Sequence, residues 1–387
     1  MTSQHTFQRT DRSRLGIWWW TTDHILLGAT VVLIALGVLL QFGTSPAAAT
    51  RLNIKWPFHF AARQSVFAAL SAALVLASSL LGPRGVRRTA FFTYGTAMLI
   101  MLALPFFGHI AKGAGRWVEF GGFTLQPSEF MKPALIVLVA WMFAESRKGE
   151  IPGVTIAFLL YLAAACLLLV EPDVGQTILI TAAFAAVFWI AGVPTTWILG
   201  MGLLSVGGLA GAYFAFPHVS NRVQTFLHHD KAGGPTQVHA AAEAIAAGGM
   251  FGRGPGEGVM KVQIPDMHTD FAYSAAAEEY GLWFSVMLVA LFGIVVIRGL
   301  YKAMRLTDPF EQMASAGLFV LVGMQAFINL AVNLALIPTK GMTLPFISYG
   351  GSSMLGMGLT MGMALALTRR RPGAYAGPEP TRASAFA

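Results

Sequence analysis

The fold is decided at residues 264–281, which read I-P-D-M-H-T-D-F-A-Y-S-A-A-A-E-E-Y-G. Asp266, His268 and Asp270 come directly before a long apolar run. Glu278 and Glu279 lie about two helical turns inside that run. An ionised carboxylate in a bilayer costs roughly 2.5–3.5 kcal/mol on insertion scales, so such groups usually face a polar cavity or a partner. The stretch therefore predicts a membrane-spanning helix that carries the chemical centre of the chain.

The composition is that of a membrane protein. Of the 387 residues, 55% are hydrophobic and only 11% are charged, which is too apolar for a soluble domain of ordinary charge content. The net charge of +8 comes from short basic clusters beside apolar runs, which is typical of anchoring loops and argues against a nucleic-acid partner. The single cysteine, Cys166, excludes an intramolecular disulfide, and its apolar surroundings predict a small core residue.

Ten apolar runs are long enough to span a bilayer, so the expected fold class is an all-α polytopic membrane protein with about ten transmembrane helices. The runs lie near residues 25–43, 59–82, 90–109, 129–145, 152–170, 174–192, 195–216, 271–298, 312–336 and 346–368. Around residues 171–173 two runs almost meet, and a re-entrant hairpin is the alternative there. The expected membrane domain covers residues 25–371, with a large extracytoplasmic loop at 217–269 between spans 7 and 8. Residues 1–24 form a cytoplasmic N-terminal segment, and 372–387 a disordered cytoplasmic tail.

The basic residues predict the orientation of the spans. With the N-terminus inside, every strong basic cluster falls on the cytoplasmic face. These clusters are Arg84, Arg87 and Arg88; Arg147 and Lys148; Arg298, Lys302 and Arg305; and Arg369, Arg370 and Arg371. Four polar connections then lie outside, at residues 112–128, 171–173, 217–269 and 338–345. We therefore expect both termini in the cytoplasm and the chemistry on the outer face.

Four cations at the outer boundary are candidates for holding an anionic group: Lys112, Arg116, Lys132 and Lys340. Lys132 lies inside the membrane boundary, where an uncompensated cation is unfavourable. It is expected to pair with Glu129, Asp173 or a bound phosphate, and snorkelling to the interface is the alternative. Asp173 either serves as a turn residue or lines the outer face. A capping interpretation makes Ser128 the N-cap of the following span.

Asp270 has two candidate roles at the entrance to the eighth span. Aspartate is a favoured N-cap residue, so capping alone is one interpretation. The other is a general base, because a carboxylate within hydrogen-bond reach of a hydroxyl nucleophile can accept its proton. Elsewhere, residues 238–247 have good helix formers and end at two glycines, which predicts a short amphipathic helix. Asn329 and Asn333 are four residues apart and predict structural hydrogen bonds to a neighbouring helix.

Five segments together resemble the SEDS family (shape, elongation, division and sporulation), membrane glycosyltransferases that polymerise lipid II into peptidoglycan strands. The segments are G-R-W-V-E-F-G-G-F-T-L-Q-P-S-E-F-M-K-P, E-P-D-V-G-Q-T, A-I-A-A-G-G-M-F-G-R-G-P-G-E-G, I-P-D-M-H-T-D-F and P-T-K-G-M-T-L-P-F-I-S-Y-G-G-S-S. The resemblance runs from about Trp18 to Arg371. The P-T-K-G element is similar to the cell-division (FtsW-type) branch, and the elongation (RodA-type) branch is the alternative.

The resemblance implies an outer-face active site with Asp270 as the catalytic carboxylate. The residues expected to bind substrate are Lys112, Arg116, Lys132, Asp173, His268, Glu278, Lys340 and Ser352. It also implies help from a divalent cation such as Mg²⁺ or Mn²⁺, at a site whose ligands the sequence does not identify. The implied partners are lipid II, the growing glycan strand, a class B penicillin-binding protein transpeptidase and other divisome membrane proteins. The implied location is the cytoplasmic (inner) membrane at the division septum.

Two rival functions belong to other classes. A lipid II flippase would use intramembrane charges along an internal path, preferably with repeat symmetry, and the chain shows no convincing internal repeat. A scaffold has no need of carboxylates at a cation-lined boundary. Purified protein given lipid II distinguishes them, because glycan product supports the enzyme, whereas lipid movement in vesicles without product supports the flippase.

The orientation predicts a labelling pattern. In a Cys166→Ala background, Gly233→Cys should react with an impermeant thiol reagent in intact cells, because residues 217–269 are expected outside, whereas Ala374→Cys should not react. Labelling of Ala374→Cys in intact cells, or of neither position until the membrane is opened, would contradict the ten-span topology.

Overall fold

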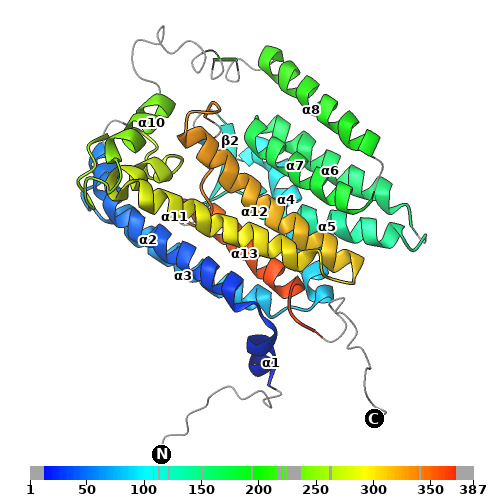
Figure 1. Ribbon diagram of the computed structural model, residues 1–387. Helices are drawn as coiled ribbons and strands as arrows, with labels where there is room; N and C mark the ends of the chain where they lie inside the picture. The colour runs from blue at the N-terminus through cyan, green and yellow to red at the C-terminus, as the bar shows by residue number, and fades with distance from the viewer. Residues whose placement is uncertain are drawn as a thin grey trace, which may run out of the picture.

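The computed structural model describes residues 13–107, 109–111, 114–120, 123–149, 151–192, 195–215, 220–221, 224, 237–260, 264–339 and 341–371. In these residues, ten helices of 17 residues or more correspond in order to the ten apolar runs (Figure 1). They are α2 (His24–Arg51), α3 (His59–Ser79), α4 (Pro83–Phe107), α5 (Ser128–Ser146), α6 (Gly153–Val170), α7 (Val174–Ile190), α8 (Thr195–Ala215), α11 (Ala272–Ala303), α12 (Pro309–Asn333) and α13 (Gly351–Leu367). The expected multi-pass helical fold is therefore confirmed. Five of the ten, α2, α3, α6, α11 and α12, are long and apolar enough to cross a membrane by length and composition alone.

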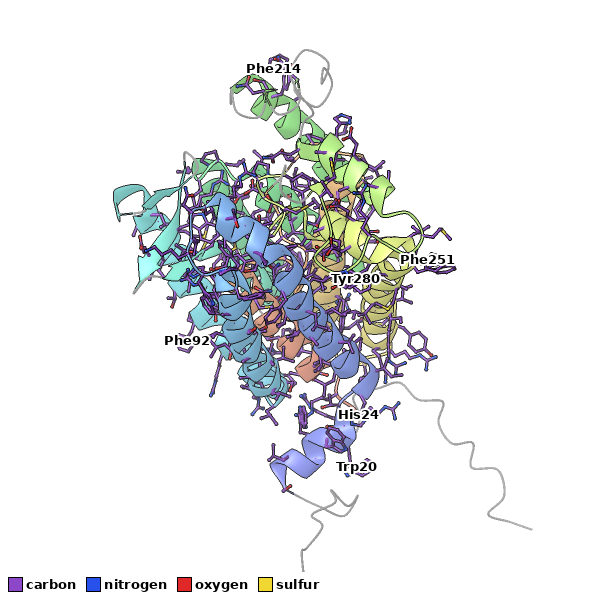
Figure 2. The ribbon with its side chains drawn as sticks, turned by 90° about the vertical axis from the view of Figure 1, so that its left-hand side faces the viewer. Trp20, His24, Phe92, Phe214, Phe251 and Tyr280 are labelled. Atoms are coloured by element: carbon purple, nitrogen blue, oxygen red, sulfur yellow. The ribbon has the colours of Figure 1, made fainter. Side chains whose placement is uncertain are left out.

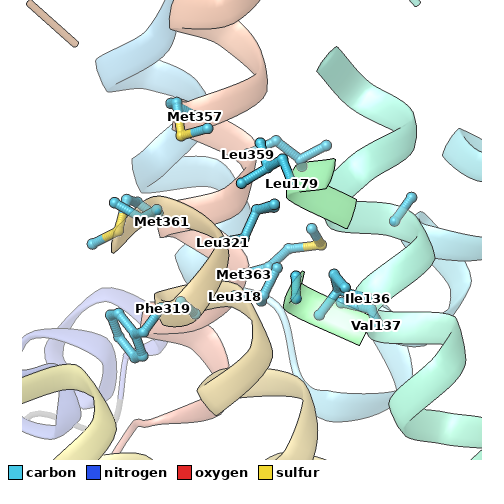
Figure 3. Close-up of a cluster of buried hydrophobic side chains, with 14 of the residues drawn as sticks. Ile136, Val137, Leu179, Leu318, Phe319, Leu321, Met357, Leu359, Met361 and Met363 are labelled. Atoms are coloured by element: carbon cyan, nitrogen blue, oxygen red, sulfur yellow. The ribbon is translucent and has the colours of Figure 1, made fainter. Parts of the chain in front are cut away.

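Helices α5, α12 and α13 form the interior of the bundle. Their buried side chains pack together, as Figure 3 shows for Ile136 of α5, Leu321 of α12 and Leu359 of α13. Helices α2 and α3 lie on one side of this interior and α6 and α7 on the other, while α8 lies against α7 at the edge (Figure 1). Because lipid and the protein core are both apolar, these helices show almost no polar stripe. The periodicity of apolar residues therefore could not predict which side chains of each helix are buried.

The basic clusters gather at one end of the bundle and are held there by ion pairs. Asp23, the N-cap of α2, lies 2.9 Å from Arg298 Nε and 3.2 Å from Lys302 Nζ near the end of α11. Desolvation alone would raise the pKa of Asp23, but its bonds to Arg298 and Lys302 outweigh burial and lower it to about 2. Two further pairs at this end are Arg87–Glu145 and Arg371–Glu311. The short helix α1 (Arg14–Thr21) lies beside them.

The opposite end carries a small sheet that the sequence analysis did not predict. Strands β1 (His109–Ala111), β2 (Ala114–Phe120) and β3 (Phe123–Leu125) form an antiparallel sheet in the order β1-β2-β3. Val118 pairs with Leu125 and Phe120 with Phe123. The signal was present in the sequence, because W-V-E-F and F-T-L flank a G-G dipeptide, which is typical of a β-hairpin.

The long connection contains the expected amphipathic helix. It is α10 (Gln237–Gly248), followed by Gly249 in the left-handed region (φ 57°), as a glycine helix stop predicts. Cys166 corrects another expectation, because its side chain is exposed on the bundle surface and does not lie in the core. The expected tail at residues 372–387, and much of the loop at 217–269, lie outside the described residues.

Helix α11 is broken at Gly281, and the segment after α10 fills the break. In an unbroken helix the N–H groups of Leu282 and Trp283 would donate to the carbonyls of Glu278 and Glu279. Instead they donate to the carbonyls of Gly249 and Met250, at 2.9 and 3.5 Å. The carbonyls of Glu278 and Glu279 accept from the Arg253 and Gly254 N–H groups, both at 3.0 Å. The two segments therefore satisfy each other's main-chain groups across the break.

The junction leaves no room for a side chain at position 281. The φ of Gly281 is 80°, and an added Cβ would lie 2.4 Å from the Gly252 nitrogen and 2.6 Å from the Met250 oxygen. With ψ at −174° the backbone is in a region that is essentially restricted to glycine, and it costs a residue with a side chain roughly 1–3 kcal/mol before any clash is counted.

Gly281→Ala should therefore lower the thermal unfolding midpoint of the purified protein in detergent clearly. The matched control is Gly293→Ala on the same helix, where an added Cβ meets nothing within 4 Å. An equal, small effect of both substitutions would show that the break tolerates ordinary helical backbone.

Candidate active site

Asp270 lies in a turn at the end of the bundle opposite the basic clusters, just before α11. It is half-buried, and the N-cap of the helix is the next residue, Phe271. The capping bonds come from another helix, because Asn333 Oδ1 of α12 accepts from the Ser274 N–H (3.1 Å) and from its hydroxyl (2.7 Å). The interpretation of Asp270 as the N-cap is therefore wrong, since Asn333 satisfies the first turn instead.

Two asparagines hold the main chain of Asp270. Asn329 Nδ2 donates to the Asp270 carbonyl (2.8 Å), and Asn333 Nδ2 donates to the same oxygen (3.0 Å). Asn329 Nδ2 also donates to the carbonyl of Met342 at 2.6 Å. The predicted hydrogen bond to a neighbouring helix is thus confirmed for Asn333, which bonds Ser274 of α11, whereas Asn329 bonds two non-helical segments. The Asn329 bonds join the Asp270 turn to the connection before α13, where a Cβ added at Gly341 would lie 3.9 Å from Asp270 Oδ2.

His268 fixes the other side of the same turn. Its carbonyl accepts from Gln41 Nε2 of α2 (3.0 Å) and from the Tyr349 N–H (2.9 Å). Its ring clusters with those of Phe60 and Tyr349, whose centroids are 4.7 and 5.7 Å from it and 5.1 Å from each other. The turn that presents Asp270 is consequently held by α2, α12 and the connection before α13.

Lys132 is completely buried beneath this end of the bundle. Its Nζ lies 3.0 Å from Glu129 Oε2 and donates to Gln325 Oε1 at 3.1 Å. Gln325 Nε2 in turn donates to the Thr343 carbonyl (3.1 Å). The expected pairing of Lys132 with Glu129 is confirmed, and snorkelling is wrong. Ser128 is not the N-cap, because Pro127 occupies that position and makes no side-chain capping bond.

Arg116 binds the short connection between α6 and α7. Its guanidinium donates to the carbonyls of Glu171 and Pro172, and Nη1 lies 3.5 Å from Asp173 Oδ2. Asp173 also caps α7, because its Oδ1 accepts from the Gln176 N–H at 3.2 Å. Asp173 therefore belongs to the turn between α6 and α7 and caps α7, while its role in lining the outer face stays a prediction.

Glu171 is buried beside this cluster. Desolvation, with the nearby Asp173 charge, raises the pKa of Glu171 to about 8 despite the opposing effect of Arg116. Burial likewise raises the pKa of Asp173, against the charge of Arg116. Glu171 thus contributes stability that is present below about pH 4.5, its ordinary pKa, and is lost as the pH rises through about 8.

The remaining expected residues have different surroundings. Ser352 Oγ accepts from the Gln126 N–H (2.9 Å) and donates to the Thr124 carbonyl (3.2 Å), which joins α13 to β3. Glu278 is fully buried, and its Oε1 accepts from the N–H groups of Val259 (2.7 Å) and Met260 (3.0 Å). It therefore holds the glycine-rich segment on α11. The two other expected cations, Lys112 and Lys340, lie outside the described residues.

The arrangement presents the Asp270 carboxylate on a firmly held turn above a buried network of paired charges. The half-buried Asp270 carboxylate can accept a proton, and the Arg116 guanidinium, paired with Asp173, places a cation at the same end. Within the described part of the chain, no three His, Cys, Asp or Glu side chains are arranged to hold a metal ion. Sequence reasoning missed the seating of Asp270 by Asn329 and Asn333, because the fold alone brings those helices together.

A multi-pass helical membrane protein with an acidic turn at one end is thus defined by the fold and by this site. The FtsW/RodA/SpoVE family profile, described as "Cell cycle protein", matches residues 24–372. The chain belongs to this family.

Individual relatives extend the comparison. The chain is 67% identical to the Caulobacter vibrioides protein named "Probable peptidoglycan glycosyltransferase FtsW", over 96% of this chain and 95% of the relative. It is 28% identical to stage V sporulation protein E of Bacillus subtilis, covering 90% and 97% of the two chains.

Solved structures share the fold. A chain of a peptidoglycan synthase complex, described as coordinating polymerization and crosslinking, superposes with a TM-score of 0.75 at 25% identity, covering 90% of this chain and 98% of that one. The rod shape determining protein RodA of Thermus thermophilus superposes with a TM-score of 0.67 at 24% identity, covering 90% and 97%.

The buried ion pair predicts a specific pattern of stability. Lys132→Met should destabilise the protein by about 3–5 kcal/mol, because it leaves the Glu129 charge buried without its partner. Lys132→Met combined with Glu129→Gln should recover most of the loss, because no net charge then remains buried. Thermal unfolding in detergent measures both. A double variant no more stable than Lys132→Met would mean that the pair is not what holds this region.

Proposed function

We propose that this protein is a peptidoglycan glycosyltransferase that polymerises lipid II into glycan strands at the outer face of the cytoplasmic membrane during cell division. Asp270 carries the proposal, because its carboxylate stands on a turn held from three sides, and Gly341 of the P-T-K-G segment adjoins it. The 67% identity to a protein named as such an enzyme over nearly its whole length supports the same activity and the division branch.

The chemistry follows from the positions of the charges. Asp270 accepts the proton of the attacking sugar hydroxyl as that oxygen forms a bond to the anomeric carbon of the second substrate. The bond from that carbon to the lipid pyrophosphate breaks, and the leaving group departs with the electron pair. Arg116 and the expected residues Lys112 and Lys340 stabilise the negative charge that develops on the pyrophosphate. Lys132 is enclosed by protein and acts from below, through Gln325 and Thr343.

Asn329 and Asn333 give the base its position. A general base is effective only within hydrogen-bond reach of the proton that it removes. The two amide groups fix the Asp270 carbonyl, and Asn329 fixes the Met342 carbonyl with the same nitrogen. Asp270 and the P-T-K-G segment are therefore held at a constant separation while the lipid substrates exchange.

A divalent cation, which the family resemblance implies, would take most of its ligands from the substrate. Since the described side chains offer no three-ligand group, pyrophosphate oxygens and water would complete the coordination, as is usual for Mg²⁺. The cation would neutralise the pyrophosphate charge. In this proposal Asp270 remains the proton acceptor.

We assign the enzyme a transpeptidase partner, a class B penicillin-binding protein, at the division septum among other divisome membrane proteins. The structural similarity to a chain of a peptidoglycan synthase complex that coordinates polymerization and crosslinking supports this assignment. The gathering of the basic clusters at the end opposite Asp270 supports cytoplasmic termini and an outer active site.

The decisive test is Asp270→Asn. Asparagine keeps the size of the side chain and removes the charge, and the loss of a general base typically costs about 10²–10⁴ in rate. Glycan synthesis from lipid II by the purified variant should fall by that factor, with normal thermal unfolding and normal partner binding.

Glu243→Gln is the matched control, because it removes an exposed acid on α10 without touching the turn. Its synthesis should equal that of the wild type. Near-normal synthesis by a folded Asp270→Asn protein would remove Asp270 from the chemistry. Lipid movement in vesicles without any glycan product would instead favour a flippase.

A further inference from the structure

Met250 and Phe251 form an apolar turn on the side of the bundle. Phe251 is 82% exposed and Met250 is 50% exposed. Figure 2 shows Phe251 pointing away from the bundle at about the level of Tyr280 in α11, well below the end of the bundle. Exposed apolar side chains at such a place indicate a surface that is covered by something other than water.

The turn is continuous with the outer face of α11. The N–H groups of Leu282 and Trp283 donate to the carbonyls of Gly249 and Met250, which fixes the turn on that face of the helix. Leu282 and Trp283 are themselves 47% and 60% exposed. Because α11 is one of the helices apolar enough to cross a membrane, its exposed face is the face that lipid contacts. The Met250–Phe251 turn extends the exposed apolar face of α11 beyond the helix itself.

The depth of the turn can be measured along the helix. Arg298, paired with Asp23, marks the basic edge of the bundle. At 1.5 Å per residue the helix advances about 26 Å from Gly281 to Arg298. The hydrocarbon core of a bilayer is about 30 Å thick, so the break and the turn beside it fall just inside the opposite boundary of the hydrocarbon. Trp283 belongs at such a boundary, where tryptophan is enriched.

The main chain of the turn also suits this environment. Irregular backbone at membrane depth is unfavourable unless its polar groups have partners within the protein. Here the carbonyls of Gly249 and Met250 accept from α11, and the N–H groups of Arg253 and Gly254 donate back to it. The hydrogen bonds across the break therefore make a non-helical segment compatible with a lipid contact.

We propose that the Met250–Phe251 turn inserts into the membrane leaflet on the Asp270 side, with lipid acyl chains covering both side chains. The turn thereby anchors the segment after α10 to the bilayer and holds this part of the long connection at headgroup level. The anchor depends on surface chemistry alone, so it stands or fails separately from the assigned reaction.

Site-directed spin labelling tests the proposal on the full chain in lipid nanodiscs. Three variants in a Cys166→Ala background carry the nitroxide: Phe251→Cys, Glu243→Cys and Val286→Cys. Glu243 is an exposed acid on α10 and reports water, whereas Val286 is 52% exposed on α11 and reports lipid. All three sites are on the surface, so the label displaces no core packing. The measurement compares collision of the label with oxygen and with a water-soluble nickel chelate.

At position 251 oxygen should collide more often than the nickel chelate, as at 286, and the order should reverse at 243. Collision with nickel at 251 as frequent as at 243 would place the turn in water and overturn the proposal. Low collision with both reagents at 251 would also overturn it, because protein, such as a second copy of the chain, would then cover the turn. Brominated acyl chains should quench a fluorophore at 251 and not one at 243.

Discussion

Inside a bilayer every main-chain polar group has to find its hydrogen-bond partner within the protein, and the structure depends on how this requirement is met in α11. An unbroken helix would meet it automatically. The break at Gly281 exposes two carbonyls and two N–H groups, and the segment after α10 provides a partner for each. A connection that would otherwise be loose is consequently bound to the helix that starts beside Asp270.

The same requirement governs the charged side chains. Lys132 is fully buried and is tolerated because Glu129 and Gln325 surround its ammonium group. The polar network around it reaches Thr343, in the connection whose Met342 carbonyl is bonded to Asn329. Charges and amides inside the bundle therefore support the Asp270 turn from below, and Asp270 is the proton acceptor in the proposed chemistry.

Much of this arrangement was predictable from the sequence, because a helix that spans a membrane requires a long run of apolar residues. The ten runs, the helix at α10 and the expectation that Lys132 is paired follow from hydropathy, helix propensity and the cost of an unpaired charge, whereas the structure selects Glu129 from the candidate partners. Features that arise from contact between distant segments were not predictable in this way. Asn333 caps α11 although it follows Ser274 by 59 positions. The outward direction of Cys166 could not be predicted either, because the lipid-facing and core-facing sides of a membrane helix are both apolar. Gly281 lies within residues 264–281, but its positive φ could not be predicted, because it depends on the close approach of Gly252 from a distant part of the chain.

Helix α2 is attached to the α11 segment at two places, its N-terminus and Gln41 in its second half. Asp23 holds Arg298 and Lys302 at the basic end, and Gln41 holds the His268 carbonyl in the turn that carries Asp270. Two attachments so far apart prevent the helices from sliding past each other by a turn, since a shift of about 5 Å would break both together. The two attachments therefore fix the register of α2 against α11 between the basic end of the bundle and the turn that carries Asp270.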